Sequence, residues 1–261
     1  MPPQEVPLRP RAYVRTLRTV YGKVGSRSQA RSSIEEQSMS QPSVIVFDVN
    51  ETLSDMAPMA GRFTDIGAPE HLAKLWFASL LRDGFALTAA GAQERFSVLG
   101  EGALRTVLAR AELNRDVDAA IEHVMAGFLS LQVHADVPDG VRALRSAGLR
   151  LVTLTNGSTR VAEELFASAG IRPEFEQLLS VEDAGTWKPA RAAYEYAARV
   201  CGTDVAEMLL VAMHPWDIDG AARAGLNTAW INRTGVPYPG YFTPPRHTVV
   251  ALTELVAALA L

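Results

Sequence analysis

Ser43-Val-Ile-Val-Phe47-Asp48 is the stretch of sequence that decides the fold. Its β-branched and aromatic residues form a continuous apolar run, which is typical of a strand buried on both faces, and the run ends in Asp48. Runs of the same character, each followed by polar residues, recur later in the chain at residues 150–155, 208–213 and 228–231. We therefore expect these segments to be the strands of one buried sheet.

Helical patterns separate these runs. We predict helices at residues 137–147, 159–169, 191–201 and 219–224, each followed by a glycine that suits the end of a helix. Asp136, which precedes Pro138, is predicted to cap the first of them. Alternation of strands and helices at this spacing indicates a parallel sheet with right-handed crossovers. The predicted fold class is therefore α/β with a Rossmann-like parallel sheet.

Residues 58–135 interrupt the alternation. They contain no convincing strand but several amphipathic stretches, such as 69–84 and 115–132, which predict an inserted all-helical cap domain. The core would then consist of residues 41–57 and 136–261. Residues 1–40 are rich in arginine and serine and poor in acidic residues, and we expect them to be a disordered extension. An organelle transit peptide, or translation that starts at Met39, would also explain them.

Composition restricts the class of protein. The 261 residues are 48% hydrophobic and 21% charged, as in an ordinary globular chain. A net charge of −4 is too mild to suggest nucleic acid as a partner. The single cysteine, Cys201, excludes an intramolecular disulfide and a multi-cysteine zinc site. With no run of apolar residues long enough for a membrane span, we expect no membrane partner and a cytoplasmic location.

Polar residues gather where the predicted strands end. In open parallel sheets the ligand site lies beyond the carboxyl ends of the strands. The polar residues expected at that edge, or in the loops beside it, are Asp48, Thr155, Asn156, Lys188, His214 and Asp217. Taken singly, such residues also serve as turn residues and helix caps. Taken together, they suit a carboxylate nucleophile that is oriented by a lysine and faces an anionic substrate.

The same residues carry a resemblance to a known family. Asp48-Val-Asn-Glu-Thr52, Thr155-Asn156-Gly157, Lys188-Pro189 and His214-Pro-Trp216-Asp217 resemble, in order, the four motifs of the haloacid dehalogenase superfamily. The last motif is similar to that of the type II, L-2-haloacid dehalogenase branch, as is Tyr194. The resemblance extends from about residue 43 to the end of the chain.

The resemblance implies a mechanism without metal or organic cofactor. Asp48 would displace halide from the alpha carbon of a small 2-haloalkanoic acid and form an ester, which water would then hydrolyse. Lys188 would keep Asp48 ionised, Thr52 would fix the turn, and Asp217 would orient either Lys188 or the attacking water. Substrate-binding roles are implied for Thr155, Asn156, Tyr194, His214 and Trp216.

The chain departs from the family at three positions. The arginine with which the family's cap holds the leaving halide falls, by ungapped alignment, at Phe77, which takes that place in our prediction of the substrate site. A serine and an asparagine of the fourth motif become Ala212 and His214. Without the arginine, the departing halide loses a charge-assisted donor. Either His214 partly replaces that donor, or it is a neutral side chain that orients Asp217.

Two alternative functions remain at the level of the sequence. A magnesium-dependent phosphatase of the same superfamily would carry an acid where this chain has Asn50 and a carboxylate ligand where it has Ala212. A catalytically silent binding protein could keep the scaffold and lose the arginine. In each case the expected partner is a small anionic molecule. The family often forms homodimers, and the sequence leaves that state open.

Overall fold

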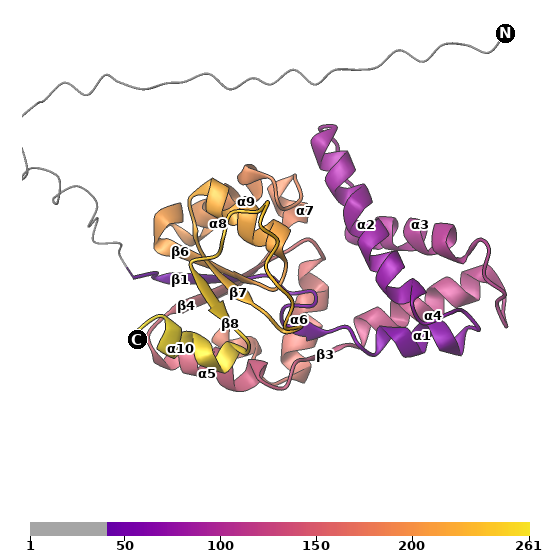
Figure 1. Cartoon of the computed structure of the whole chain (residues 1–261), viewed down its shortest axis with the longest axis horizontal. Helices are drawn as coiled ribbons and strands as arrows, with labels where there is room; N and C mark the ends of the chain where they lie inside the picture. The colour runs from indigo at the N-terminus through magenta and orange to yellow at the C-terminus, as the bar shows by residue number, and fades with distance from the viewer. Residues whose placement is uncertain (1–40) are drawn as a thin grey trace, which may run out of the picture. The chain divides into compact units, whose positions relative to one another are not determined.

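A parallel sheet lies at the centre of the computed structural model, which describes residues 41–261 (Figure 1). The predicted extension, residues 1–40, lies outside the described residues. Among the residues described, the sheet has six strands, which lie side by side in the order β5 (Gln177–Ser180), β4 (Arg150–Thr155), β1 (Val44–Phe47), β6 (Met208–Ala212), β7 (Asn227–Ile231) and β8 (His247–Val249). Every neighbouring pair is parallel, which confirms the predicted α/β class.

Strand β1 occupies the middle of the sheet and shows why its sequence is wholly apolar. Val44 and Val46 pack into one hydrophobic cluster, and Ile45 and Phe47 into another on the opposite face. All four side chains are fully buried. The chain passes from β1 to β4 and β5 on one side, and then returns to β6 on the other. This reversal of strand order beside β1 is the point at which open α/β sheets bind their ligands.

Helices cover both faces of the sheet. Apolar residues of α5 (Val137–Ser146), α6 (Thr159–Ser168) and α10 (Leu255–Ala258) pack on one face, and those of α8 (Arg191–Cys201) and α9 (Pro215–Ala224) pack on the other. The connections contain the short helix α7 (Val181–Ala184) and the 3₁₀ turns η1 (Arg172–Glu174), η2 (Val205–Glu207) and η3 (Leu252–Glu254). None of the helices described in residues 41–261 is long and apolar enough to cross a membrane.

The structure differs from the prediction at the edges of the sheet. Strands β5 and β8 were not predicted, because they lie at the two edges of the sheet and carry polar residues such as Gln177 and His247. Helix α9 begins at Pro215, four residues before the predicted start, since proline suits the first turn of a helix. Asp136 makes no side-chain cap bond at the start of α5. Its two oxygens accept hydrogen bonds from Arg233 and from the backbone N–H of Leu252 instead.

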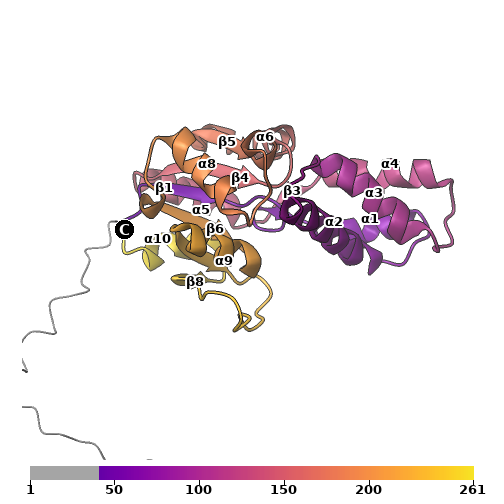
Figure 2. The same ribbon diagram turned by 90° about the horizontal axis from the view of Figure 1, so that it is seen from above.

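A helical insertion separates β1 from β4 (Figures 1 and 2). It consists of α1 (Met59–Asp65), α2 (Leu72–Ala89), α3 (Phe96–Leu108) and α4 (Val117–Leu129). Two-residue strands, β2 (Ser54–Asp55) and β3 (Gln132–Val133), pair antiparallel where the chain enters and leaves the insertion. Strand β3 lies in the region where we predicted no strand. A strand of two residues is too short to produce the alternating or apolar pattern by which strands are predicted.

Trp76 forms the centre of the insertion. Its fully buried ring lies edge-on to Phe128, with ring centroids 6.0 Å apart, and its Nε1 donates a hydrogen bond of 2.9 Å to the carbonyl of Gly100. Phe77 and Phe96 are buried beside it, with ring centroids 6.5 Å apart. The aromatic pattern of α2 therefore builds the interior of the insertion.

Trp187 connects the insertion to the sheet. Its ring stacks on Phe96 at an interplanar angle of 10°, and its Nε1 donates a 3.0 Å hydrogen bond to the carbonyl of Glu94. Its backbone N–H donates to the hydroxyl of Thr88 at 3.3 Å. Since Trp187 directly precedes Lys188, these contacts also fix the position of the lysine loop.

Gly84→Ala is expected to lower the free energy of unfolding by about 1–3 kcal/mol, because overpacking displaces a rigid buried ring. A Cβ at Gly84 would lie 2.5 Å from the ring of Trp187. The matched control is Gly102→Ala in α3, where a Cβ meets nothing within 4 Å. Gly102→Ala should raise the free energy of unfolding by about 0.5–1 kcal/mol, the ordinary preference of a helix for alanine over glycine. Urea denaturation measures the free energy of unfolding of both variants. Equal changes in the two would show that the close contact between residue 84 and Trp187 does not determine the loss of stability.

Candidate active site

The turn that follows β1 positions Asp48. The Thr52 hydroxyl donates a 2.6 Å hydrogen bond to Asp48 Oδ2, and the backbone N–H of Met213 donates to Thr52 Oγ1 at 3.0 Å. The Arg233 guanidinium donates to the carbonyl oxygen of Thr52 through Nε and Nη2, at 3.1 and 3.0 Å. The turn is thus held by the segments that follow β6 and β7, so that the Asp48 carboxylate has one orientation.

Lys188 lies between two carboxylates. Its ammonium donates hydrogen bonds of 2.9 Å to Asp48 Oδ1 and 2.6 Å to Asp217 Oδ2, and its side chain is completely buried. Asn156, after β4, holds the backbone of the lysine: Lys188 N–H donates to Asn156 Oδ1 at 3.0 Å, and Asn156 Nδ2 donates to Lys188 O at 3.4 Å. The amide of Asn156 therefore positions the lysine loop.

Tyr194 completes the surroundings of Asp217. The phenol of this α8 residue donates a 2.6 Å hydrogen bond to Asp217 Oδ1, and Lys188 takes the other oxygen. Asp217 is 0% exposed, as is Tyr194. Both oxygens of Asp217 are thus occupied by donors in a site that excludes water.

Electrostatics distinguish the two aspartates. Burial alone would raise the pKa of Asp48, but the charges of Lys188 and His214 and the Thr52 hydrogen bond outweigh it, so the pKa lies below its ordinary value. Burial and the neighbouring Asp48 charge raise the pKa of Asp217 in spite of Lys188. Burial lowers the pKa of Lys188, yet the two carboxylates raise it more, so its pKa lies above the ordinary value. The surroundings therefore favour the ionised form of Asp48 more strongly than that of Asp217.

His214 lies on the other side of Asp48. Its ring stacks on Trp216, with centroids 5.1 Å apart, and its Nε2 lies 3.6 Å from Asp48 Oδ2. The same nitrogen is 3.6 Å from Glu51 Oε2 and 3.2 Å from the carbonyl oxygen of Asn50. Trp216 in turn packs edge-on against Phe85 of α2, so the insertion covers this side of the site.

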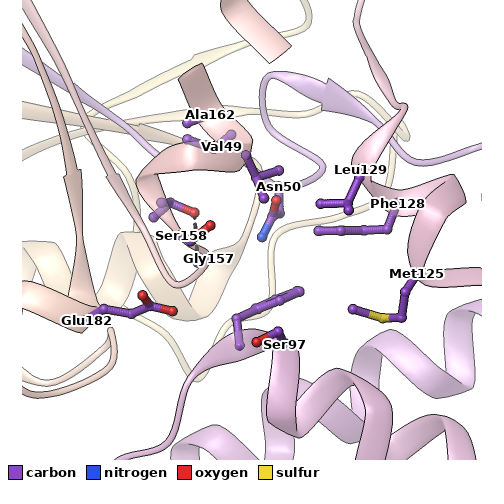
Figure 3. A pocket seen from close by; sticks show the side chains of 13 residues that line it. Val49, Asn50, Ser97, Met125, Phe128, Leu129, Gly157, Ser158, Ala162 and Glu182 are labelled. Carbon is purple, nitrogen blue, oxygen red and sulfur yellow. Dashed lines mark hydrogen bonds between the residues drawn. The ribbon is translucent and has the colours of Figure 1, made fainter. Parts of the chain in front are cut away.

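A small cavity lies between the carboxyl end of β4 and the insertion (Figure 3). Its volume is about 60 Å³. Polar groups of the core line one wall, among them Asn50, Thr155 and Ser158, and the apolar side chains of Phe96, Met125 and Phe128 line the other. Ser158 precedes α6 and makes no side-chain cap bond, so it leaves the first N–H groups of that helix without a side-chain acceptor.

The structure brings most of the predicted site residues together. One hydrogen-bonded group, together with the stacked rings beside it, contains Asp48, Thr52, Lys188, Tyr194, His214, Trp216 and Asp217. Thr155 and Asn156 lie at the adjacent end of β4. Phe77 is not in the group: it is packed inside the insertion against Trp76 and Phe96, and it does not line the cavity. Glu51, which sequence reasoning missed, lies beside His214.

Metal ligands do not gather in the residues described. Between residues 41 and 261, no group of three or more histidine, cysteine, aspartate and glutamate side chains is arranged to hold a metal ion. The charged group of the site consists instead of two carboxylates bridged by an ammonium.

The site has three features: an ionised aspartate at the switch point of a Rossmann-like sheet, a buried lysine that bridges it to a second aspartate, and a helical insertion that faces them. Together these features define a class of hydrolases with an aspartate nucleophile. The family model of the haloacid dehalogenase-like hydrolases matches residues 42–225. The chain belongs to this family.

Individual relatives agree with this assignment. An (S)-2-haloacid dehalogenase of Pseudomonas sp. (strain YL) is 32% identical over 215 residues, which cover 81% of this chain and 92% of that protein. Haloacetate dehalogenase H-2 of Moraxella sp. (strain B) is 29% identical over 85% of this chain and 100% of its own length. The crystal structure of an L-2-haloacid dehalogenase superposes with a TM-score of 0.80 at 29% identity, covering 85% of this chain and 100% of that one.

Proposed function

We propose that this protein is an (S)-2-haloacid dehalogenase, which removes halide from a small 2-haloalkanoic acid by way of an ester on Asp48. The observation that carries the proposal is the buried Lys188 ammonium, 2.9 Å from Asp48 and 2.6 Å from Asp217. It holds one carboxylate ionised and oriented, which is what a nucleophilic aspartate requires. The relatives named as dehalogenases at 29–32% identity support the same reaction.

In the first step, an Asp48 oxygen attacks C2 of the substrate. The new C–O bond forms on one side of C2 as the C–halogen bond breaks on the other, and the halide leaves with the bonding electrons. No proton is transferred in this step, so a carboxylate is sufficient as the nucleophile. Lys188 and Thr52 position Asp48, while Tyr194 and Lys188 hold Asp217, whose role is to orient the lysine.

The substrate carboxylate is proposed to bind at the start of α6. Unpaired N–H groups at a helix N-terminus favour an anion, and Thr155 and Ser158 line the cavity there. Asn156 contributes by fixing the lysine loop, and Trp216 with His214 forms the wall beside Asp48. Phe77 acts indirectly, because it supports Phe96, which lines the cavity. A volume of about 60 Å³ suits a short acid with few non-hydrogen atoms.

We also propose that the helical insertion is a cap, residues 58–135, over a core made of residues 41–57 and 136–261. The contacts of Trp187 with Glu94 and of Trp216 with Phe85 support this division, since they bring the insertion against the loops that carry Lys188 and Asp217. The cytoplasmic location and the homodimer stay predictions.

The phosphatase alternative is less favoured by the side chains present. Asn50 carries a neutral amide, which cannot act as the general acid of a phosphatase. Ala212 is buried at the end of β6 and offers no carboxylate at the position where a metal ligand would stand. A silent binding protein is disfavoured by a buried charged group that would be costly to retain without use.

Free halide released from 2-chloropropionate and from haloacetates, in buffer with a chelator, tests the proposal. Because the mechanism uses no metal, we expect (S)-2-chloropropionate to yield one halide per molecule at a rate that the chelator does not change. Phosphate release from p-nitrophenyl phosphate that needs magnesium, without any halide, would establish a phosphatase. Absence of both activities would favour the binding protein.

A further inference from the structure

We propose that the cavity beside Asp48 selects a 2-haloalkanoic acid with a hydroxyl group on C3, and that Asn50 is the residue that recognises this hydroxyl. The inference rests on the proposed function, because it takes the substrate to be a 2-haloacid whose carboxylate binds at the start of α6. It adds the chemical nature of the group that the rest of the cavity binds.

Asn50 is a buried polar residue whose side chain has no partner among the described residues. It is only 8% exposed, and its backbone carbonyl faces His214 Nε2 at 3.2 Å. Its side-chain amide makes no hydrogen bond with any other residue between 41 and 261, and it points into the cavity (Figure 3). A buried amide that stays unpaired is costly, so this amide indicates a ligand that supplies the missing hydrogen bonds.

The position of Asn50 relative to the carboxylate site indicates which part of the substrate it meets. A Cβ placed on Gly157 would lie 3.5 Å from Asn50 Nδ2, so the amide is held close to the start of α6. The carboxylate has the Ser158 hydroxyl and the first N–H groups of α6 as donors there. C3 is two bonds from the carboxylate carbon, so a group on C3 is the next part of the substrate within reach of Asn50.

The space beside Asn50 continues between α4 and α6. A second cavity, of about 10 Å³, shares Asn50 with the first, and the other residues that line both cavities are apolar: Phe128, Leu129 and Val161. Asn50 is thus the polar residue common to both cavities. A substituent that extends from C2 into this space therefore meets one polar group in apolar surroundings, which is how binding pockets achieve specificity.

A hydroxyl group matches the amide of Asn50. Nδ2 donates and Oδ1 accepts, and a hydroxyl accepts from the one and donates to the other. In the free protein, a polar cavity of about 60 Å³ is large enough to hold water. The methyl group of 2-chloropropionate would displace that water without replacing its hydrogen bonds to Asn50, whereas a hydroxymethyl group replaces them.

Glu182 restricts the charge of the same substituent. It lies in α7, where its N–H donates a 3.0 Å hydrogen bond to Ser180 Oγ, and its side chain lines the cavity (Figure 3). Its carboxylate makes no ion pair or hydrogen bond with another residue between 41 and 261. A second carboxylate on the substrate would face this charge without helix N–H groups to offset it, so the group on C3 is neutral.

Halide release from (S)-2-chloro-3-hydroxypropionate and from (S)-2-chloropropionate tests the role of Asn50. We expect kcat/KM of the wild type to be about 10–100-fold higher for the hydroxylated acid, the usual effect of leaving one buried polar group unpaired. Asn50→Leu, which removes the amide at similar volume, and Asn50→Ala, which adds no bulk, should both reduce this ratio to about 1 or below. Because both acids are measured on the same variant, a general loss of activity cancels in the ratio.

The role of Glu182 is tested with (S)-2-chlorosuccinate, which carries a carboxylate on C3. Glu182→Gln should raise kcat/KM for this acid by at least about 10-fold, because it removes a like charge from the cavity. The matched control is Asp183→Asn, which changes the neighbouring exposed carboxylate of α7 and should leave the relative rates for all three acids as in the wild type.

Binding of the two products provides a measurement that needs no reaction. Calorimetry of the wild type should give a Kd for (R)-2,3-dihydroxypropionate that is about 10-fold or more below that for (R)-lactate, and Asn50→Leu should remove the difference. Equal kcat/KM values for the hydroxylated and the plain acid, or a ratio that Asn50→Leu leaves unchanged, would overturn the inference. A preference for 3-amino-2-chloropropionate over the hydroxylated acid would also overturn it, because an ammonium cannot accept from Nδ2. If the wild type releases no halide from any of these acids, the proposed function fails, and the difference in product binding still decides whether Asn50 recognises a hydroxyl.

Discussion

Asp48→Asn is expected to abolish halide release, with a fall in kcat on the order of 10⁴–10⁶-fold, as when other covalent enzymes lose their nucleophile. A neutral amide oxygen is a poor nucleophile toward C2, and the side chain cannot form the ester that water later cleaves. The electrostatics favour this assignment over Asp217, because the pKa of Asp48 is lowered whereas that of Asp217 is raised.

Halide release and intact mass of the variant provide the measurement. Its fold should persist, since Lys188 keeps its 2.6 Å hydrogen bond to Asp217 and the introduced amide side chain has nearly the same volume as the carboxylate that it replaces. Circular dichroism and Tm are the control for that point. A well-folded Asp48→Asn protein with more than a few per cent of wild-type activity would contradict the assignment of the nucleophile.

The sequence was sufficient for the centre of the sheet. Strands β1, β4 and β6 are buried on both faces, so their sequences are dominated by aliphatic and β-branched residues and have no solvent-exposed polar face. Strands β5 and β8 were missed because edge strands need fewer apolar residues. Once the parallel sheet was predicted, its carboxyl edge followed, and with it the approach of Asp48, Lys188 and Asp217, which are far apart in the chain.

The missed features depend on the direction of single side chains. Glu51 lies in a turn at φ 60°, and nothing in the sequence shows that its carboxylate faces His214. Phe77 was assigned by alignment to the substrate site, but helical geometry directs it into the insertion, toward Trp76 and Phe96. Asp136 suits a helix cap locally, yet a tertiary contact with Arg233 competes for the same carboxylate. Local patterns cannot indicate such choices, because they are decided by partners distant in sequence.

Lys188→Met is expected to abolish activity and to destabilise the fold by about 3–5 kcal/mol, the cost of removing one partner from a buried ion group. Asp48 and Asp217 would then be buried with no ammonium between them. Their mutual repulsion and burial would raise the pKa of each carboxyl group, so that Asp48 would lose nucleophilic character as well as orientation. The loss of activity and the loss of stability thus both result from removing the ammonium between the two carboxyl groups.

The pH dependence of the stability of Lys188→Met follows from the same unpaired, buried carboxyl groups. A carboxyl group whose pKa is higher in the folded than in the unfolded state lowers stability as pH rises above its unfolded value. The deficit of Lys188→Met relative to wild type should therefore be larger at pH 8 than at pH 5. Urea denaturation at both pH values measures it, and a deficit that is independent of pH would show that lost packing, rather than unpaired charge, is responsible.

A double variant separates stability from chemistry. Lys188→Met combined with Asp217→Asn leaves a single unpaired carboxylate, and coupled sites of this kind usually interact by about 0.5–3 kcal/mol. The double variant should thus be more stable than Lys188→Met by an amount in that range, while halide release remains absent because Asp48 still lacks its ammonium. If the second substitution gave no recovery, the two carboxylates would not be coupled through Lys188. If it restored turnover, the lysine would be needed only to neutralise Asp217.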